Sequence, residues 1–174
     1  MAKTSCYGFS IAKLQSKMGE KMNIGSRSIH LVDIENQMGG AVSSAAISKF
    51  FEHYCETVGI GEQDHVVVGV SSSQALMELP LSLMGAYRFV FMPGTDGADK
   101  ALQDVMLNEC LPERFSTIIC ASGDGGFVPA ISALTAEKAH VIVAAPLNSI
   151  AKTMRMAAHQ TIELSIDYLE QDVA

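Results

Sequence analysis

The chain has few of the residues that build cross-links and soft-metal sites. Its 174 residues include four cysteines, none in a C-x-x-C pair, and five histidines scattered along the chain. A zinc site is therefore not expected. No run of about eighteen apolar residues occurs, so no membrane span is predicted. The N-terminal segment lacks the apolar stretch of a secretory signal, which favours reduced thiols and a cytoplasmic location.

Two glycine-rich nucleotide motifs are also absent. No G-x-x-x-x-G-K-[ST] sequence occurs, so a P-loop nucleotidase is not supported. Gly123, Gly125 and Gly126 lie between an expected strand and an expected helix, but their spacing is not G-x-G-x-x-G. Asp124 also stands where a pyrophosphate would have to approach. A dinucleotide site is therefore rejected.

Charged residues are few and unevenly placed. They make up 18% of the chain against 48% apolar residues, which indicates a folded chain of single-domain size. The net charge of −7 argues against tight, nonspecific binding to nucleic acid. Residues 1–27 carry five basic residues and one acid. We expect a basic tail over residues 1–27, either a mobile charged segment or a short helix that helps to hold nucleic acid or a partner, and one domain over 28–174.

Strands and helices alternate along this domain. Apolar runs predict a strand that ends at Asp33 and strands at 65–70, 87–92, 116–121, 140–144 and 161–164. Helical spacing predicts a helix that starts near Ser43 or Ser44 and helices at 74–84 (interrupted near Pro80), 96–109, 127–137 and 149–158, with a loop at 37–42. This order predicts an α/β fold in which five to six parallel strands carry helices on both faces.

Acidic side chains follow three of the expected strands. Asp33 ends the first strand, Asp99 follows the third, and Asp124 follows the fourth. Because the carboxyl ends of parallel strands meet at one edge of a sheet, we expect these acids to lie together. Clustered carboxylates favour a hard cation such as Mg²⁺ or Mn²⁺, which can activate a water and stabilise charge on a phosphoryl oxygen. The pattern predicts metal-dependent cleavage of phosphodiesters.

Each acid also has a structural interpretation. An unpaired carboxylate in an apolar strand is costly, so function is favoured for Asp33. Asp124 could instead be a turn or cap residue. Asp96 and Asp99 are spaced like a helix cap and its partner three residues on, which makes Asp96 the expected cap and Asp99 the expected ligand. Glu35 either points the same way as Asp33 or caps locally.

Two basic residues lie on the last expected helix. Lys152 and Arg155 are three residues apart and share a polar face with His159. They either grip a phosphate of the substrate or form an ordinary solvated surface.

Four segments together resemble the bacterial NYN domains of the PIN-like nuclease superfamily. They are LVDIENQMGG, PGTDGADKAL, ASGDGGFVPAISAL and VIVAAPLNSIAKTMRMAAHQTIEL, and the resemblance runs from about Ile29 to Leu164. It implies a three-layer α/β/α sandwich around a parallel sheet. It also implies Mg²⁺- or Mn²⁺-dependent endonuclease activity, usually on RNA.

The resemblance assigns roles residue by residue. Asp33, Asp99 and Asp124 look like the metal-binding acids. Asn36 looks like the asparagine that orients the first motif, and Ser122 looks like the hydroxyl beside the third.

One position departs from the family pattern. Many relatives have a second aspartate two residues after the first one of the Ser-Gly-Asp motif, where this chain has Gly126. The site therefore holds one metal or two, or recruits Asp96 or Glu35. The first hypothesis is a ribonuclease; the second is a catalytically weak module that binds RNA or a protein partner; the third is a hydrolase of small phosphoesters. A homodimer that forms a composite groove is a further expectation.

Overall fold

The computed structural model describes residues 27–39, 42–83 and 85–165. The predicted basic tail, apart from Arg27, lies outside these residues. The helices and strands alternate as follows: β1 (Ser28–Asp33), α1 (Ile34–Met38), α2 (Ser44–Thr57), β2 (His65–Val70), α3 (Ser73–Ser82), β3 (Tyr87–Phe91), α4 (Gly97–Asn108), α5 (Leu111–Arg114), β4 (Thr117–Ala121), the 3₁₀ turn η3 (Gly125–Phe127), α6 (Val128–Ala136), β5 (His140–Pro146), α7 (Lys152–Ala157) and β6 (Gln160–Leu164).

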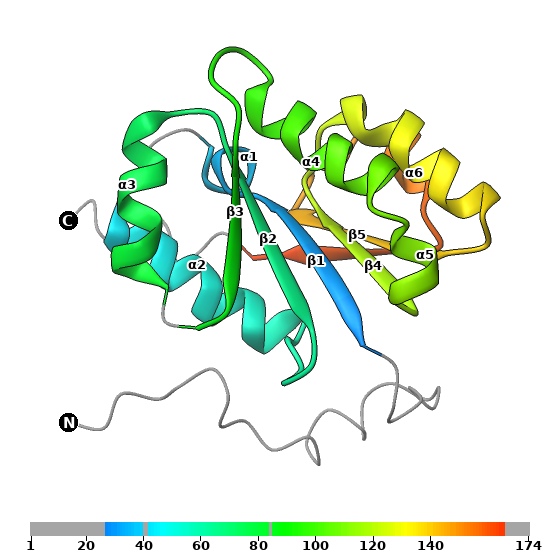
Figure 1. Cartoon of the computed structure of the whole chain (residues 1–174), viewed down its shortest axis with the longest axis horizontal. Coiled ribbons are helices and arrows are strands. Elements are labelled where there is room, and N and C mark those ends of the chain that lie inside the picture. The colour runs from blue at the N-terminus through cyan, green and yellow to red at the C-terminus, as the bar shows by residue number, and fades with distance from the viewer. Residues whose placement is uncertain (1–26, 40–41, 84, 166–174) are drawn as a thin grey trace.

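All six strands of the sheet are parallel, and their order is β3-β2-β1-β4-β5-β6. The first strand therefore lies in the centre, and the chain winds outward from it in both directions. Helices cover the two faces, with α2 and α3 on one side and α4 and α6 on the other (Figure 1). The predicted three-layer α/β/α fold with a parallel sheet is confirmed.

The strands are apolar because both of their faces are covered. Along β1, Ile29 and Leu31 pack in the core beneath α4 and α6, whereas Val32 packs in the core beneath α2 and α3. In β2, Val67 and Val68 divide between the same two cores. Side chains alternate across a strand, so a sheet with helices on both faces needs apolar residues at almost every position.

Three local elements differ from the sequence predictions. Where a loop was expected at 37–42, residues Ile34–Met38 form the short helix α1, which is capped by Asp33 and ends at Gly39 with a φ of 67°. The turn of helix α5 was not predicted. Helix α3 was expected to break near Pro80, but it continues through this residue and ends two residues later. Pro80 is exposed, so its ring faces solvent.

Some large apolar side chains remain on the surface. Met77 and Leu81 of α3 are 75% and 78% exposed, and Phe91 and Met92 at the end of β3 are 40% and 39% exposed. In the part of the chain that the structure describes, no helix combines the length and the apolar character needed to cross a membrane.

Candidate functional site

Asp33 lies at the carboxyl end of the central strand and is 3% exposed. Its neighbours β2 and β4 belong to the two halves of the sheet that wind in opposite directions. This is the switch point at which parallel α/β sheets form ligand sites. The Asp33 carboxylate accepts hydrogen bonds from the Asn36 backbone N–H at 3.2 Å and from Ser122 Oγ at 3.2 Å. Its orientation is therefore set by α1 and by the loop after β4.

Asp99 brings a second carboxyl group to Asp33. It lies in the first turn of α4, close enough to Asp33 for the two carboxyl groups to change each other's pKa. The start of α4 presses closely on the loop after β3. A Cβ at Gly97 would lie 1.9 Å from the Met92 carbonyl oxygen, so only glycine allows this approach. The close approach delivers Asp99 to the end of β1.

This proximity changes how both acids hold protons. Burial, followed by the hydrogen bond with Asp99, raises the pKa of Asp33 to about 7. Burial also raises the pKa of Asp99, and the charges of Asp124, Asp96 and Glu35 act in the same direction. Near neutral pH the pair therefore retains a proton that two separated aspartates would have lost.

Asp124 combines the two roles that the sequence left open. It is exposed, and its Oδ1 accepts a hydrogen bond from the Gly126 N–H at 2.7 Å, which caps the turn η3. Its negative charge nevertheless acts to raise the pKa of Asp99. The expected cap is therefore present, and the same carboxylate lies at the rim of the acidic cluster.

Ser122 joins two of the acidic motifs. It is fully buried, its hydroxyl donates to Asp33, and the same oxygen accepts from the Asp124 N–H at 3.2 Å. Its hydroxyl therefore links the first and third acidic motifs, and the expectation that it binds substrate stays a prediction.

Asn36 holds the loop that carries Asp124. Its Oδ1 accepts a hydrogen bond from the Gly123 N–H at 3.0 Å. On the other side, the Gly123 carbonyl accepts from the Ala151 N–H at 3.0 Å, and a Cβ at Gly123 would lie 2.5 Å from the Ser149 carbonyl oxygen. The loop is therefore held between α1 and the segment before α7. The Asn36 side chain bonds to the third motif, whereas its backbone N–H bonds to Asp33 of the first.

Two further acids were candidates for recruitment. The Glu35 carboxylate accepts from the Ser71 N–H and hydroxyl and from the Ser72 N–H, so it fastens the loop after β2. Although burial opposes the shift, these bonds lower the pKa of Glu35. Asp96 occupies the N-cap position of α4, but its side chain makes no capping hydrogen bond. Its backbone has a φ of 56°. The predicted capping interaction is wrong because this conformation differs from the extended backbone of an ordinary N-cap.

The two basic candidates differ in their surroundings. Arg155 pairs with Glu163 of β6 at 2.6 Å, and both side chains are over one third exposed. Lys152 is exposed at the first residue of α7, which lies next to η3. His159 accepts through Nδ1 from the Val141 N–H. Arg155 therefore belongs to a surface ion pair. Lys152 directly follows Ala151, whose N–H bonds to the loop of Asp124.

Gln37 was not singled out from the sequence. It is 1% exposed, its Nε2 donates to the Ala144 carbonyl at 3.1 Å, and its Oε1 is the buried side-chain atom without a partner among the described residues. Only its place directly after the D-x-E-N element could have drawn attention to it. It ties α1 to β5.

The donor atoms of the cluster are all oxygens. Carboxylates, a hydroxyl and an amide suit Mg²⁺ or Mn²⁺ and suit soft metals poorly. Within the described ranges, no three His, Cys, Asp or Glu side chains are gathered as a preformed metal-binding group. The chemistry of the donor set fits a hard cation, and Asp33 and Asp99 are two candidate ligands that lie close together.

Comparisons with known proteins bear on the fold. No family model and no curated protein matches the chain. The chain is similar to the crystal structure of a protein of unknown function from Vibrio parahaemolyticus RIMD 2210633, with a TM-score of 0.50 and 18% sequence identity. The match covers 82% of this chain and 93% of that chain. At this identity it shows a shared fold, and the resemblance to the NYN domains stays a prediction.

Proposed function

We propose that this protein is a Mg²⁺- or Mn²⁺-dependent endonuclease that hydrolyses phosphodiester bonds, with RNA as its substrate. The proximity of the carboxyl groups of Asp33 and Asp99 carries the proposal. Placing the partly buried Asp99 beside the buried Asp33 costs free energy, because burial and mutual repulsion both oppose ionisation. Asp33 caps α1, but this structural role does not require a second carboxyl group beside it. A bound cation would offset the repulsion.

Three acids would hold the cation, namely Asp33, Asp99 and Asp124. When bound, Mg²⁺ or Mn²⁺ supplies an activated water and stabilises charge on the phosphoryl group. The protein's own contribution is orientation. Ser122 and the Asn36 N–H fix the Asp33 carboxylate, and the Asn36 side chain holds the loop of Asp124. This preorganisation of the acids supports a reaction site over a surface cluster.

A basic side chain supports a phosphate-containing substrate. Lys152 is exposed on α7, which contacts the turn η3 that Asp124 caps. We assign it to a phosphate of the bound strand. Arg155 would have to leave Glu163 to join it, so its contribution is smaller. Charge on the rest of the domain is acidic, so RNA binding should depend on the cation as well as on Lys152.

A cleavage assay tests the proposal. Single-stranded and structured RNAs are incubated with Mn²⁺ and wild type, Asp33→Asn or Asp104→Asn. Asp104 is an exposed acid further along α4, so its substitution removes the same charge outside the cluster. We expect Asp33→Asn to lower the cleavage rate at least about 100-fold, beyond the effect of changing a supporting residue. Equal rates for wild type and Asp33→Asn would refute catalysis at this site.

A second function is a catalytically weak module that binds RNA or a protein partner. It is favoured because two nearby acids already accept hydrogen bonds from the protein itself. Glu35 is bonded to the loop after β2, and Asp124 caps η3. Gly126 also stands where relatives have a further acid. RNA binding in EDTA, unchanged by Asp33→Asn and without cleavage in Mn²⁺, would establish this function in place of the first.

A further inference from the structure

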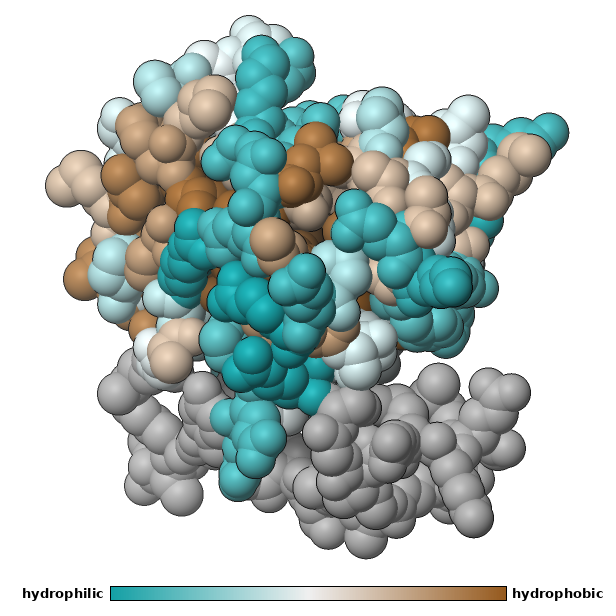
Figure 2. Space-filling model, turned by 45° about the vertical axis from the view of Figure 1, so that its right-hand side comes forward, coloured by the Kyte–Doolittle hydropathy of each residue, from teal (hydrophilic) through white to brown (hydrophobic). Residues whose placement is uncertain are grey.

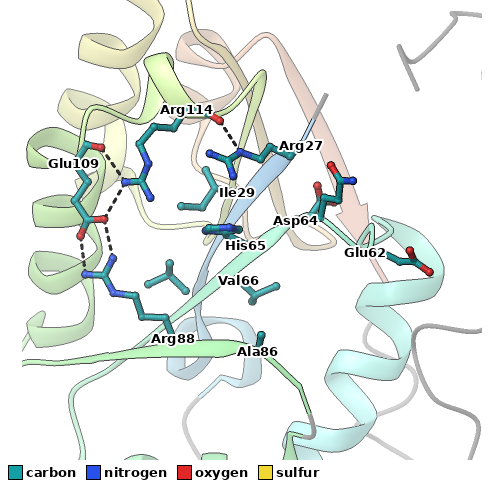
Figure 3. A pocket seen from close by; sticks show the side chains of 12 residues that line it. Arg27, Ile29, Glu62, Asp64, His65, Val66, Ala86, Arg88, Glu109 and Arg114 are labelled. Atoms are coloured by element: carbon teal, nitrogen blue, oxygen red, sulfur yellow. Dashed lines mark hydrogen bonds and ion pairs between the residues drawn. The ribbon is translucent and has the colours of Figure 1, made fainter. Parts of the chain in front are cut away.

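We propose a second ligand site at the amino ends of the strands, opposite the end that carries Asp33. Its ligand would be a phosphorylated small molecule of nucleotide size. A cavity of about 460 Å³ lies there, at the beginnings of β1, β2 and β3 (Figure 3). This volume falls in the range of about 300–1,000 Å³ that small-molecule sites occupy. Hydrophilic residues gather over the lower part of the face in Figure 2, towards the ends where the strands begin. The site is separate from the acidic cluster around Asp33.

Three arginines form one wall of this cavity. Arg27, Arg88 and Arg114 come from the residue before β1, from β3 and from α5; Arg88 and Arg114 contact Glu109, and Arg27 lies beside Arg114 (Figure 3). Glu109 accepts two hydrogen bonds from Arg88, at 2.7 and 2.6 Å, and lies 3.6 Å from Arg114. One carboxylate therefore pairs with two of the three guanidinium groups, and this wall carries an excess of two positive charges.

Arg27 and Arg114 are already positioned beside each other. Both guanidinium groups lie over the ring of Phe115, at 4.9 and 5.2 Å from its centroid. The Arg27 Nε donates to the Arg114 carbonyl at 2.9 Å, which leaves the two terminal nitrogens of Arg27 without a partner among the described residues. A phosphate monoester carries a charge of about −1.5 to −2, which matches the excess of two positive charges on this wall. Its oxygens also suit the planar donor forks of arginine.

The rest of the cavity differs in character from the arginine wall. Its floor is apolar, because Ile29, Val66 and Val67 are buried there. The ring of His65 packs edge-on against Phe115 at 5.1 Å. This floor would contact an apolar or aromatic part of the ligand. Inorganic phosphate alone would leave it uncovered.

The wall opposite the arginines is acidic. Figure 3 shows Asp64 and Glu62 on the side away from Glu109. Asp64 already accepts from the Ser28 and Gly61 N–H groups, at 2.6 and 2.7 Å. Glu62 is exposed and is the acid of this wall that can accept hydrogen bonds from a ligand. A phosphate at one end, a ring in the middle and hydroxyl or amino donors at the other end describe a nucleoside monophosphate.

Calorimetry with adenosine 5′-monophosphate, adenosine and inorganic phosphate tests this site. We expect the monophosphate to bind more tightly than either fragment, because only it spans both walls. Arg27→Gln and Arg114→Gln should each weaken binding at least about tenfold, the effect of losing one charge-assisted hydrogen bond. Lys138→Gln, which removes an exposed cation elsewhere, should leave binding unchanged.

Asp33→Asn separates this site from the proposed nuclease. The variant should bind the monophosphate as wild type does, since Asp33 lies at the other edge of the sheet. Loss of binding in Asp33→Asn would place the ligand at the acidic cluster and overturn the proposal. Binding that neither arginine substitution weakens, or that inorganic phosphate or adenosine matches, would overturn it as well.

Discussion

Replacing Gly126 with aspartate should make the stability of this protein depend on a divalent cation. A Cβ at Gly126 would lie 3.3 Å from Asp124 Oδ1, so an added carboxylate starts beside the existing one. Gly126 is exposed and is not among the residues with positive φ, so a side chain there brings no backbone strain. The substitution tests whether a cation binds next to this loop.

The magnitude follows from the exposure of the two carboxylates. Two like charges about 4 Å apart repel by about 1 kcal/mol in water and by about 4 kcal/mol at an effective dielectric constant of 20. Both Asp124 and Gly126 are exposed, so we expect a value near the lower end, about 1 kcal/mol. Without a cation, Gly126→Asp should therefore unfold more easily than Gly126→Asn. With a cation, a tenfold gain in affinity adds about 1.4 kcal/mol at saturating metal and should reverse the order.

Urea unfolding in EDTA and in Mn²⁺ measures both states. Gly126→Asn is the matched control, because it loses the same glycine flexibility and adds a side chain of the same shape without a charge. RNA cleavage measured in parallel should rise in Gly126→Asp. If Mn²⁺ stabilises the aspartate and asparagine variants equally, then no cation binds between residues 124 and 126. The assignment of Asp124 as a metal ligand would then be wrong.

Three other substitutions have definite expectations. Gly97→Ala should lower the free energy of unfolding by about 1–3 kcal/mol or more. The new Cβ would lie 1.9 Å from the Met92 carbonyl oxygen and displace α4 together with Asp99, so RNA cleavage should fall as well. Urea unfolding that matches wild type would contradict this close approach. Although burial opposes the shift, hydrogen bonds lower the pKa of Asp64, so its contribution is present above a pH of about 3.8 and is lost as the pH falls through the lowered value. Asp64→Asn should therefore cost about 1.5–3 kcal/mol at pH 7, and this cost should shrink as the pH falls below 3.8, as denaturant curves at pH 7 and across the acid range would show; a cost that does not change with pH would refute the assignment. Lys152→Gln should weaken RNA binding, measured by filter retention, more than Arg155→Gln does, because Glu163 already neutralises Arg155; the opposite order would reverse their roles.

The sequence was sufficient to find the fold and the central acid. Apolar runs separated by helical spacing predicted the strands, and six parallel strands are present. Asp33 could be recognised because a lone carboxylate at the end of such a run is costly unless the fold uses it. The expected loop at 37–42 failed for a local reason. A helix as short as α1 depends on one cap and one left-handed glycine, and neither produces a periodic pattern.

Contacts between distant elements were beyond the sequence. Glu35, which follows β1, accepts hydrogen bonds from Ser71 and Ser72, which follow β2. The spacing of Glu35 from Asp33 in the sequence does not predict this contact. The burial of Ser122 likewise depends on how β4 lies against β1. The arginine wall escaped notice because its three residues come from three separate elements. Each of them alone reads as an ordinary surface charge.

The central position of β1 also has a consequence for how the protein is made. Asp33 is bonded to Ser122, 89 residues later in the chain. At about 5–20 residues per second, a ribosome needs roughly 4–18 s to synthesise that interval. During this time β1 lacks the strand that will flank it on one side, and Asp33 lacks the hydroxyl that will orient it. The acidic site therefore forms only after β4 and Ser122 have been made, although its first residue is made early. A nascent chain that stops before β4 contains Asp33 and Asp99 but not the site.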